Sequence, residues 1–344
     1  MRPNGSWPAR AAALRTHGFV AVAVSLLAAC QPDAPTPPNV QPRPTQTAAA
    51  PKQDQSQPPA WYEALPVADD VEGLIAYNGQ DGDIWVANAD GNDARQVTDS
   101  GEGIDYSMTW APDGSQLAFR TTRGRSAPGV DPSNIFIIDL KTGEERQLTP
   151  PSGGIFPAWS PDGTWIAFSD RHGINLIRPD GSDVRRLGTD GECSVWSPDG
   201  SRIMYCSNAV NRGGSGDNWD IFVINRDGTG RARLTHGPYS EHNGVWSPDG
   251  SRIIFSSDRD GSVDLYRMNA DGTQVVQLTD TEGIEAGPAA WLSDGRLILA
   301  HYEPEAPLGH WYLTDESGRP VASLPWLYGA LDPIAYLPAA ESSR

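Results

Sequence analysis

Several residues that could do chemistry stand shortly before a recurring aromatic residue in this 344-residue chain. The acids among them lie four to six positions upstream of that residue, and other polar and aromatic side chains share the same segments. Carboxylates and a histidine can act as general acids and bases, and an acidic cluster can receive a basic peptide, a cation or a cationic glycan group. The candidate residues are Asp105, Tyr106, Phe156, Glu192, Glu241, His242, Asn243, Glu285 and Asp332.

A repeated phrase indicates the elements that must position these residues. TWAPDG begins at Thr109, AWSPDG at Ala158, VWSPDG at Val195 and Val245, and a weaker AWLSDG at Ala290. The tryptophans of the five copies are 49, 37, 50 and 45 residues apart. This spacing is close to the roughly 40–50 residues of a four-stranded propeller blade, so we expect the repeated aromatic and Asp-Gly residues to be structural.

Each copy reads as a hairpin, because Pro presets the φ of a type I turn and Gly takes the left-handed φ that closes it. A third strand, such as Asp83–Val86, and a short outer strand, such as Gln96–Thr98, follow in every unit. The six units predict an all-β fold, a six-bladed β-propeller of four-stranded antiparallel blades.

The two ends of the repeat region predict how the ring closes. The first unit, which starts at Leu74, has no tryptophan strand before it, whereas Asp332–Pro338 aligns with Gly287–Ser293 at the far end. Tyr336 then takes the tryptophan position. We expect this C-terminal strand to pair beside Leu74–Tyr77 in the first blade, since closure removes an exposed sheet edge.

The N-terminal residues 1–29 have the pattern of a signal peptide, with three arginines in the first 15 residues and an apolar stretch, Gly18–Ala29. Twelve apolar residues are too few for a transmembrane helix, which needs about 20. The ending Leu-Ala-Ala-Cys resembles a bacterial lipoprotein box, in which Cys30 carries the lipid. An ordinary secretory peptide that contains Cys30 is the alternative.

The rest of the chain divides into a tether and the propeller. Residues 30–65 are expected to be the lipidated Cys30 and a disordered Pro-rich segment, since nine prolines in residues 31–60 accompany few apolar side chains. Residues 66–341 are expected to be the propeller. Gln31, where an Asp would favour inner-membrane retention, suggests an exported protein that is lipid-anchored at the cell envelope, on the periplasmic face of the outer membrane in a Gram-negative cell.

Charge and composition limit the partners. The formal net charge is −18, which argues against a nucleic-acid partner. We expect no cofactor and no metal, because no second histidine holds the blade position of His242 and a catalytic metal takes about three protein ligands. The chain is expected to be a monomer.

Cys193 and Cys206 flank one hairpin, and two registers are possible. If the turn is symmetric about Asp199-Gly200, the two cysteines oppose each other and could form a disulfide. If Pro198–Gly200 is a three-residue loop with a bulge, Cys193 faces Tyr205 instead. The turn chemistry favours the second register, so we expect two unpaired thiols.

The Trp-Ser-Pro-Asp-Gly, Ile-Ala-Phe-Ser, Asp-Ile-Phe-Val and Gln-Leu-Thr phrases, over residues 71–338, resemble the TolB-like, WD-repeat-like propeller family. The resemblance implies a cell-envelope protein whose propeller binds proteins or peptides. The family's namesake partners a peptidoglycan-associated lipoprotein and has an extra α/β domain, where this chain has the expected tether. Related blades occur in prolyl-oligopeptidase-type peptidases, but the sequence contains no Gly-x-Ser-x-Gly nucleophile elbow.

We therefore predict a membrane-tethered, non-catalytic propeller that binds an envelope protein, peptide or polysaccharide through the mouth of its central channel. The candidate residues named first would form that mouth. The alternative is a glycan-acting lyase or hydrolase that uses the acids and His242 in the mouth.

Overall fold

The computed structural model describes residues 62, 64–101, 103–123, 133–150, 153–208, 218–280, 284–302, 309–327 and 330–339. The predicted signal peptide, Cys30 and the tether up to residue 61 lie outside these ranges. Within the described part of the chain, no helix has the length and apolar character that a membrane crossing requires.

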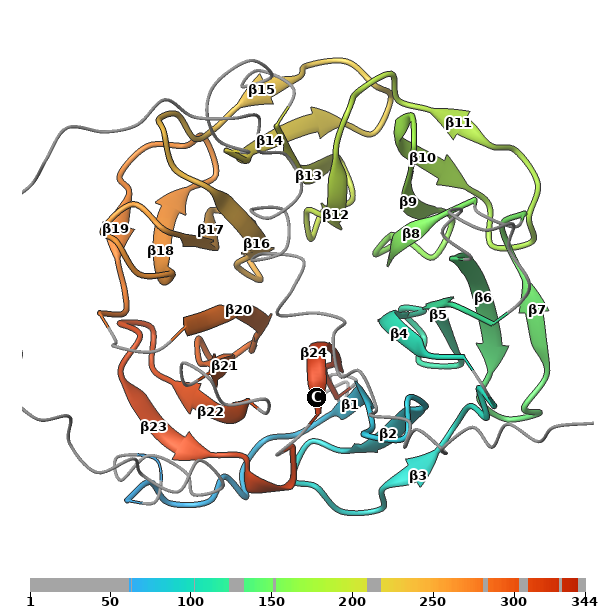
Figure 1. Ribbon diagram of the computed structural model, residues 1–344, viewed down its shortest axis with the longest axis horizontal. Helices are drawn as coiled ribbons and strands as arrows, with labels where there is room; N and C mark the ends of the chain where they lie inside the picture. Colours follow the sequence, from blue (N-terminus) through green and yellow to red (C-terminus); the bar gives the residue numbers. More distant parts are fainter. Residues whose placement is uncertain are drawn as a thin grey trace, which may run out of the picture. The chain divides into compact units, whose positions relative to one another are not determined.

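Six four-stranded antiparallel sheets, the blades, surround a central axis (Figure 1). In the second to sixth blades the first strand in the chain lies innermost, whereas the innermost strand of the first blade is the last strand of the chain. The first blade contains β1 (Leu74–Asn78), β2 (Ile84–Asn88) and β3 (Arg95–Gln96), and its fourth strand comes from the end of the chain. The second blade contains β4 (Asp105–Trp110), β5 (Gln116–Thr121), β6 (Asn134–Asp139) and β7 (Glu145–Gln147). The third contains β8 (Ile155–Trp159), β9 (Ile166–Asp170), β10 (Gly173–Ile177) and β11 (Arg185–Arg186).

The other three blades follow the same order. They are β12 (Glu192–Trp196), β13 (Arg202–Ser207), β14 (Asp220–Asn225) and β15 (Ala232–Arg233); β16 (Glu241–Trp246), β17 (Arg252–Ser257), β18 (Asp264–Asn269) and β19 (Val276–Gln277); and β20 (Ile284–Trp291), β21 (Leu297–Tyr302), β22 (His310–Thr314) and β23 (Pro320–Ser323). A 3-10 turn, η2 (Pro325–Leu327), leads to β24 (Leu331–Leu337), the inner strand of the first blade. The predicted six-bladed propeller is confirmed.

The Pro-Asp-Gly turns form for the chemical reason that the sequence suggests. Gly200 has φ 67° and Gly250 has φ 69°, the left-handed region that glycine adopts without strain. The Asp199 carboxylate accepts hydrogen bonds from the Ser197 hydroxyl at 2.6 Å and from the Ser201 amide at 3.0 Å. This side-chain bracket holds the turn that joins β12 to β13.

The recurring tryptophans pack between blades, as expected of structural residues. Trp110, Trp159, Trp196 and Trp246 are each at most 9% exposed. The indole of Trp196 donates a hydrogen bond to the Ala158 carbonyl of the preceding blade at 3.0 Å. These indoles therefore contribute buried apolar area, and that of Trp196 also contributes a hydrogen bond between neighbouring blades.

The ring closes as the sequence predicts. Strand β24 pairs antiparallel with β1, and Leu337, Tyr336 and Ala335 lie opposite Leu74, Ile75 and Ala76 (Figure 1). The Trp110 indole of the second blade also donates to the Ala335 carbonyl at 3.1 Å. The last strand of the chain thus bonds to both the first and the second blade.

The outer strands end earlier than the sequence suggests. Strand β3 covers residues 95–96 rather than 96–98, and Thr98 turns its hydroxyl inward, where it accepts a hydrogen bond from the Ile84 amide at 2.9 Å. Thr149, Thr235 and Thr279 make the equivalent bond. In these four blades the threonine hydroxyl therefore accepts a hydrogen bond from the backbone amide of the neighbouring strand, while the carbonyl of that donor residue still accepts a backbone hydrogen bond from the outer segment.

Candidate functional site

Four inner strands carry the same irregularity before their tryptophan. A β-bulge interrupts the pairing of β4, β8, β12 and β16 with the next strand. Three positions before each tryptophan, the backbone φ is positive: Ser107 at 50°, Phe156 at 52°, Cys193 at 59° and Asn243 at 51°. Left-handed backbone at non-glycine residues is uncommon, and bulges of this kind re-aim neighbouring side chains. The same left-handed residue therefore recurs at one position in four consecutive blades.

The residue just before each left-handed position is paired with a residue of the second strand of its blade. Tyr106 pairs with Arg120, Glu192 with Cys206 and His242 with Ser256. We use the name mouth cluster for Tyr106, Arg120, Phe156, Glu192 and His242, which come from four blades.

Arg120 is the centre of one side of the mouth cluster. Its guanidinium carbon lies 4.6 Å from the centre of the Tyr106 ring and 6.0 Å from that of Phe156, which is within the range of cation–π attraction. The Arg120 Nε also donates to the Ser133 hydroxyl at 2.7 Å. Ring stacking and this hydrogen bond hold the half-buried cation between the second and third blades.

Glu192 and His242 form the other side of the mouth cluster. Burial raises the pKa of Glu192, and the neighbouring Cys206 raises it further, while the charges of His242 and Arg120 act in the opposite direction. His242 Nε2 lies 2.8 Å from the Ser240 hydroxyl, and its ring centre is 5.6 Å from that of Trp219. The charges that act on Glu192 thus come from the second and fifth blades.

Asp105 and Glu241 do not form the exposed acidic mouth that the sequence suggests. Both side chains are fully buried, and each is paired with an arginine 18 residues later in the chain. Arg123 donates from Nε to Asp105 at 2.9 Å, and Arg259 donates to Glu241 at 3.0 Å. Burial raises the pKa of Glu241, and Arg259 opposes this effect. The two acids are buried charges, each paired with an arginine.

A bulge within the strand, rather than the turn, sets the register of the two cysteines. Near the turn, Trp196 lies opposite Ile203 and Val195 opposite Met204, which is the symmetric register. The bulge between Glu192 and Val195 then shifts the register by one residue, so that Glu192 lies opposite Cys206 and Cys193 falls within the bulge. The two cysteines therefore do not oppose each other, and both thiols are free, as expected.

The remaining candidates are only partly described. Asn243 is exposed, next to His242. Glu285 lies in β20 and Asp332 in β24, and for both the structure describes the backbone alone. Cys30 lies outside the described residues. Among the described residues, no three His, Cys, Asp or Glu side chains are grouped so as to hold a metal ion.

Arg120 is not among the residues predicted for the site, although the sequence contains a signal for it. In the same register position the other blades have small or uncharged residues, among them Ser169, Cys206 and Ser256. An arginine that interrupts such a series is a candidate for a specific role.

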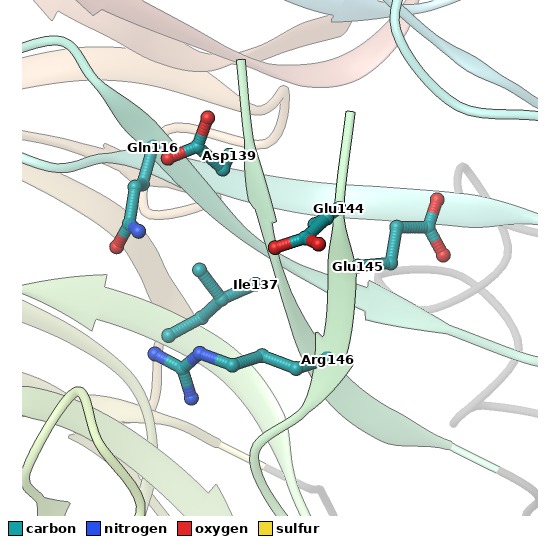
Figure 2. A pocket seen from close by; sticks show the side chains of 6 residues that line it. All are labelled: Gln116, Ile137, Asp139, Glu144, Glu145 and Arg146. Atoms are coloured by element: carbon teal, nitrogen blue, oxygen red, sulfur yellow. The ribbon is translucent and has the colours of Figure 1, made fainter. Parts of the chain in front are cut away.

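A pocket of about 310 Å³ lies elsewhere, on the outer part of the second blade. Its lining comes from β5, β6 and β7, and Glu144 and Glu145 point to opposite sides there (Figure 2). The Asp139 carboxylate accepts hydrogen bonds from the backbone amides of Lys141 and Thr142, and the Glu145 carboxylate accepts one from Arg123. No member of the mouth cluster lines this pocket.

Comparisons with known proteins agree with the fold. Residues 195–307 match the TolB beta propeller domain. An uncharacterized protein of Agrobacterium fabrum is 31% identical over 154 residues, which are 42% of this chain and 50% of that protein. A protein TolB homolog of Chlorobium luteolum is 31% identical over 159 residues, 44% of this chain and 33% of that protein. The chain thus spans half or less of the length of these two relatives.

Among solved structures, TolB from Acinetobacter baumannii superposes with a TM-score of 0.61 and 23% identity. The similarity covers 79% of this chain and 68% of that one. The chain is thus a six-bladed β-propeller that is similar to TolB propellers, with the family match over residues 195–307.

Proposed function

We propose that this protein binds a protein or peptide of the cell envelope through the mouth cluster, without catalysing a reaction. The observation that carries the proposal is the half-buried Arg120, which lies against the half-buried Phe156 and the buried Tyr106 beside the bulges of the inner strands. Tyrosine and arginine dominate the binding energy of many protein interfaces, especially where neighbouring residues hold them in place. The TolB-like fold is consistent with this role.

The state of the acids gives less support to the glycan-acting enzyme. Hydrolysis of a glycosidic bond commonly uses two carboxylates that can exchange protons with the substrate and water. Asp105 and Glu241 are fully buried, and each is hydrogen-bonded to an arginine. Neither is available for proton transfer in this arrangement, and among the candidate acids whose side chains the structure describes only Glu192 remains, which does not supply a carboxylate pair.

In this proposal, the chain is exported and held at the envelope by a lipid on Cys30, and the Pro-rich segment predicted within residues 30–65 acts as a tether. The sequence pattern of residues 1–30 supports this part of the proposal. A polysaccharide is the second class of partner that an aromatic and arginine surface could bind.

The proposal is tested by affinity capture from solubilised envelopes with the wild-type protein, Arg120→Ala and Arg186→Ala. Arg186 lies exposed on outer strand β11, so its variant controls for the loss of one positive charge. We expect wild type and Arg186→Ala to capture the same envelope protein and Arg120→Ala to lose it, with similar melting temperatures for all three. Equal capture by Arg120→Ala would contradict the proposal.

A further inference from the structure

The sixth blade carries two buried histidines that have no part in the proposed binding. His301 on β21 is 3% exposed, and His310 on β22 is 4% exposed. The strand register places the two residues directly opposite each other. Residues directly opposite in an antiparallel pair share one face of the sheet, with Cβ atoms about 4.5–5.5 Å apart. Two imidazoles therefore stand next to each other on one face of this blade.

The inner strand of the blade adds an acidic residue to the same row. Strands β20, β21 and β22 are neighbours in the sheet (Figure 1). Glu285 on β20 is the register partner of His301, so Glu285, His301 and His310 occupy one row across three strands. The structure describes the backbone of Glu285, and the backbone register gives this place. Two histidines and one glutamate are a set of three ligands that zinc takes in proteins.

The equivalent row of the fifth blade has its charge balanced by an arginine. There the row begins with Glu241 and Ser257, and Arg259, two residues after Ser257, pairs with Glu241 at 3.0 Å. The second blade has the same arrangement. In the sixth blade the residue two positions after His301 is an acid, Glu303. Histidines are thus the basic residues of this row, where two other blades rely on an arginine.

Packing encloses the row between the fifth and sixth blades. Leu299 lies two residues before His301, on the same face of β21, and packs in one cluster with Leu265 of the fifth blade. Tyr62 belongs to this cluster, and its ring centre lies 5.0 Å from that of His310. An apolar shell of this kind limits the access of water to a metal. The contact with Tyr62 also restrains the orientation of the His310 ring.

We propose that Glu285, His301 and His310 bind one zinc ion, which ties the inner, second and third strands of the sixth blade together. The site is separate from His242, for which the sequence predicts no metal. The burial of both histidines assigns the ion to stabilising the blade rather than to meeting a substrate. Because imidazole binds zinc in its neutral form, zinc affinity falls as the pH is lowered.

The first experiment measures the metal and its ligands without changing the row. The full chain with Cys30→Ala, purified without a histidine tag, is stripped with a chelator, titrated with Zn²⁺ by calorimetry and studied by X-ray absorption spectroscopy. We expect one zinc ion per chain, nitrogen and oxygen ligands that include imidazole, and a melting temperature that rises with zinc. A chain that binds no zinc would overturn the proposal. A sulfur ligand at about 2.3 Å would do the same, because it would place the metal on a cysteine.

Variants in the same background assign the ligands. His301→Ala and His310→Ala should each abolish zinc binding. Glu285→Gln should weaken it by more than about tenfold, which is the smallest loss typical of removing an outer-shell partner. His236→Ala is the matched control, because His236 is exposed and its loss should leave zinc binding unchanged.

Near-ultraviolet circular dichroism checks that each variant is folded. Zinc affinity that stays unchanged in a folded variant of any of the three row residues would contradict the site. An equal loss of binding in His236→Ala would contradict it as well. If a histidine variant does not fold, the ligands seen by X-ray absorption in the chain with the intact row decide the question.

Discussion

Glu241 and Arg259 form an ion pair of 3.0 Å in which the carboxylate side chain is fully buried and the arginine is 20% exposed. Arg259 also lies 5.6 Å from the centre of the Phe255 ring, so the cation is packed as well as paired. Three blades away, Asp105 and Arg123 form the same arrangement at the same spacing in the chain. Acids that the sequence suggests for a binding surface thus form internal ion pairs in the propeller.

Removing the arginine of one pair should destabilise the fold. Arg259→Leu leaves the Glu241 charge buried without its partner, and we expect the free energy of unfolding to fall by about 3 kcal/mol, as for other buried pairs that lose one member. Chemical denaturation measures this change.

Two controls accompany that variant. The double variant Arg259→Leu, Glu241→Leu should recover part of the loss, because no charge remains buried. Asp183→Asn, in an exposed pair with Arg185, should change the free energy by no more than about 0.5 kcal/mol. If Arg259→Leu were as stable as wild type, the ion pair would have no structural role.

Glu192 should make stability depend on pH in a defined direction. Its pKa is raised by burial and by Cys206, so the folded protein binds the proton more tightly than the unfolded chain does. Stability therefore falls as the pH rises from the ordinary glutamate value of 4.5 through the raised folded-state value.

Glu192→Gln removes that dependence. We expect the variant to melt at a higher temperature than wild type at neutral pH, and the difference to disappear as the pH falls below the ordinary value. Melting curves over a pH series measure both effects. A variant that is less stable than wild type at neutral pH would show that the Glu192 carboxylate makes favourable contacts that outweigh its burial.

Cys30 should decide how the protein is held at the envelope. With the lipid on Cys30, wild type fractionates with membranes and incorporates labelled fatty acid, whereas Cys30→Ala is released in soluble form. Cys193→Ser serves as a matched control, since its cysteine lies in the propeller and its removal should leave the label in place. Labelling of Cys30→Ala would refute anchoring through this residue.

The number of blades, their hairpins and the closing strand could be predicted because they depend on local information. The repeat period, the glycine at each turn and the displaced last strand are all present in short segments. Tyr336, for example, takes its place beside Ile75 from the alignment of one seven-residue segment.

The arrangement of the site could be predicted only in part, because it depends on backbone irregularities and on contacts between blades. The register in the fourth blade shifts at a bulge within β12 and not at the turn, and no turn residue signals a bulge within the strand. The arginines that neutralise Asp105 and Glu241 follow β5 and β17, the second strands of their blades. Because these partners stand far from the acids in the sequence, the acids alone predicted an acidic surface that the structure does not have at these two positions. Arg120 acquires its role only where the rings of two blades meet around it.

The most direct test of the proposed binding face is site-specific photo-crosslinking in intact envelopes. A photoreactive phenylalanine analogue replaces Phe156, which keeps an aromatic ring at this left-handed position, and replaces Val184, an exposed residue 59% accessible outside the mouth cluster, as control. We predict that Phe156 captures one specific envelope protein, that Val184 does not, and that Arg120→Ala abolishes the capture. Capture from Val184 alone, or capture from Phe156 that persists in Arg120→Ala, would contradict binding through the mouth cluster.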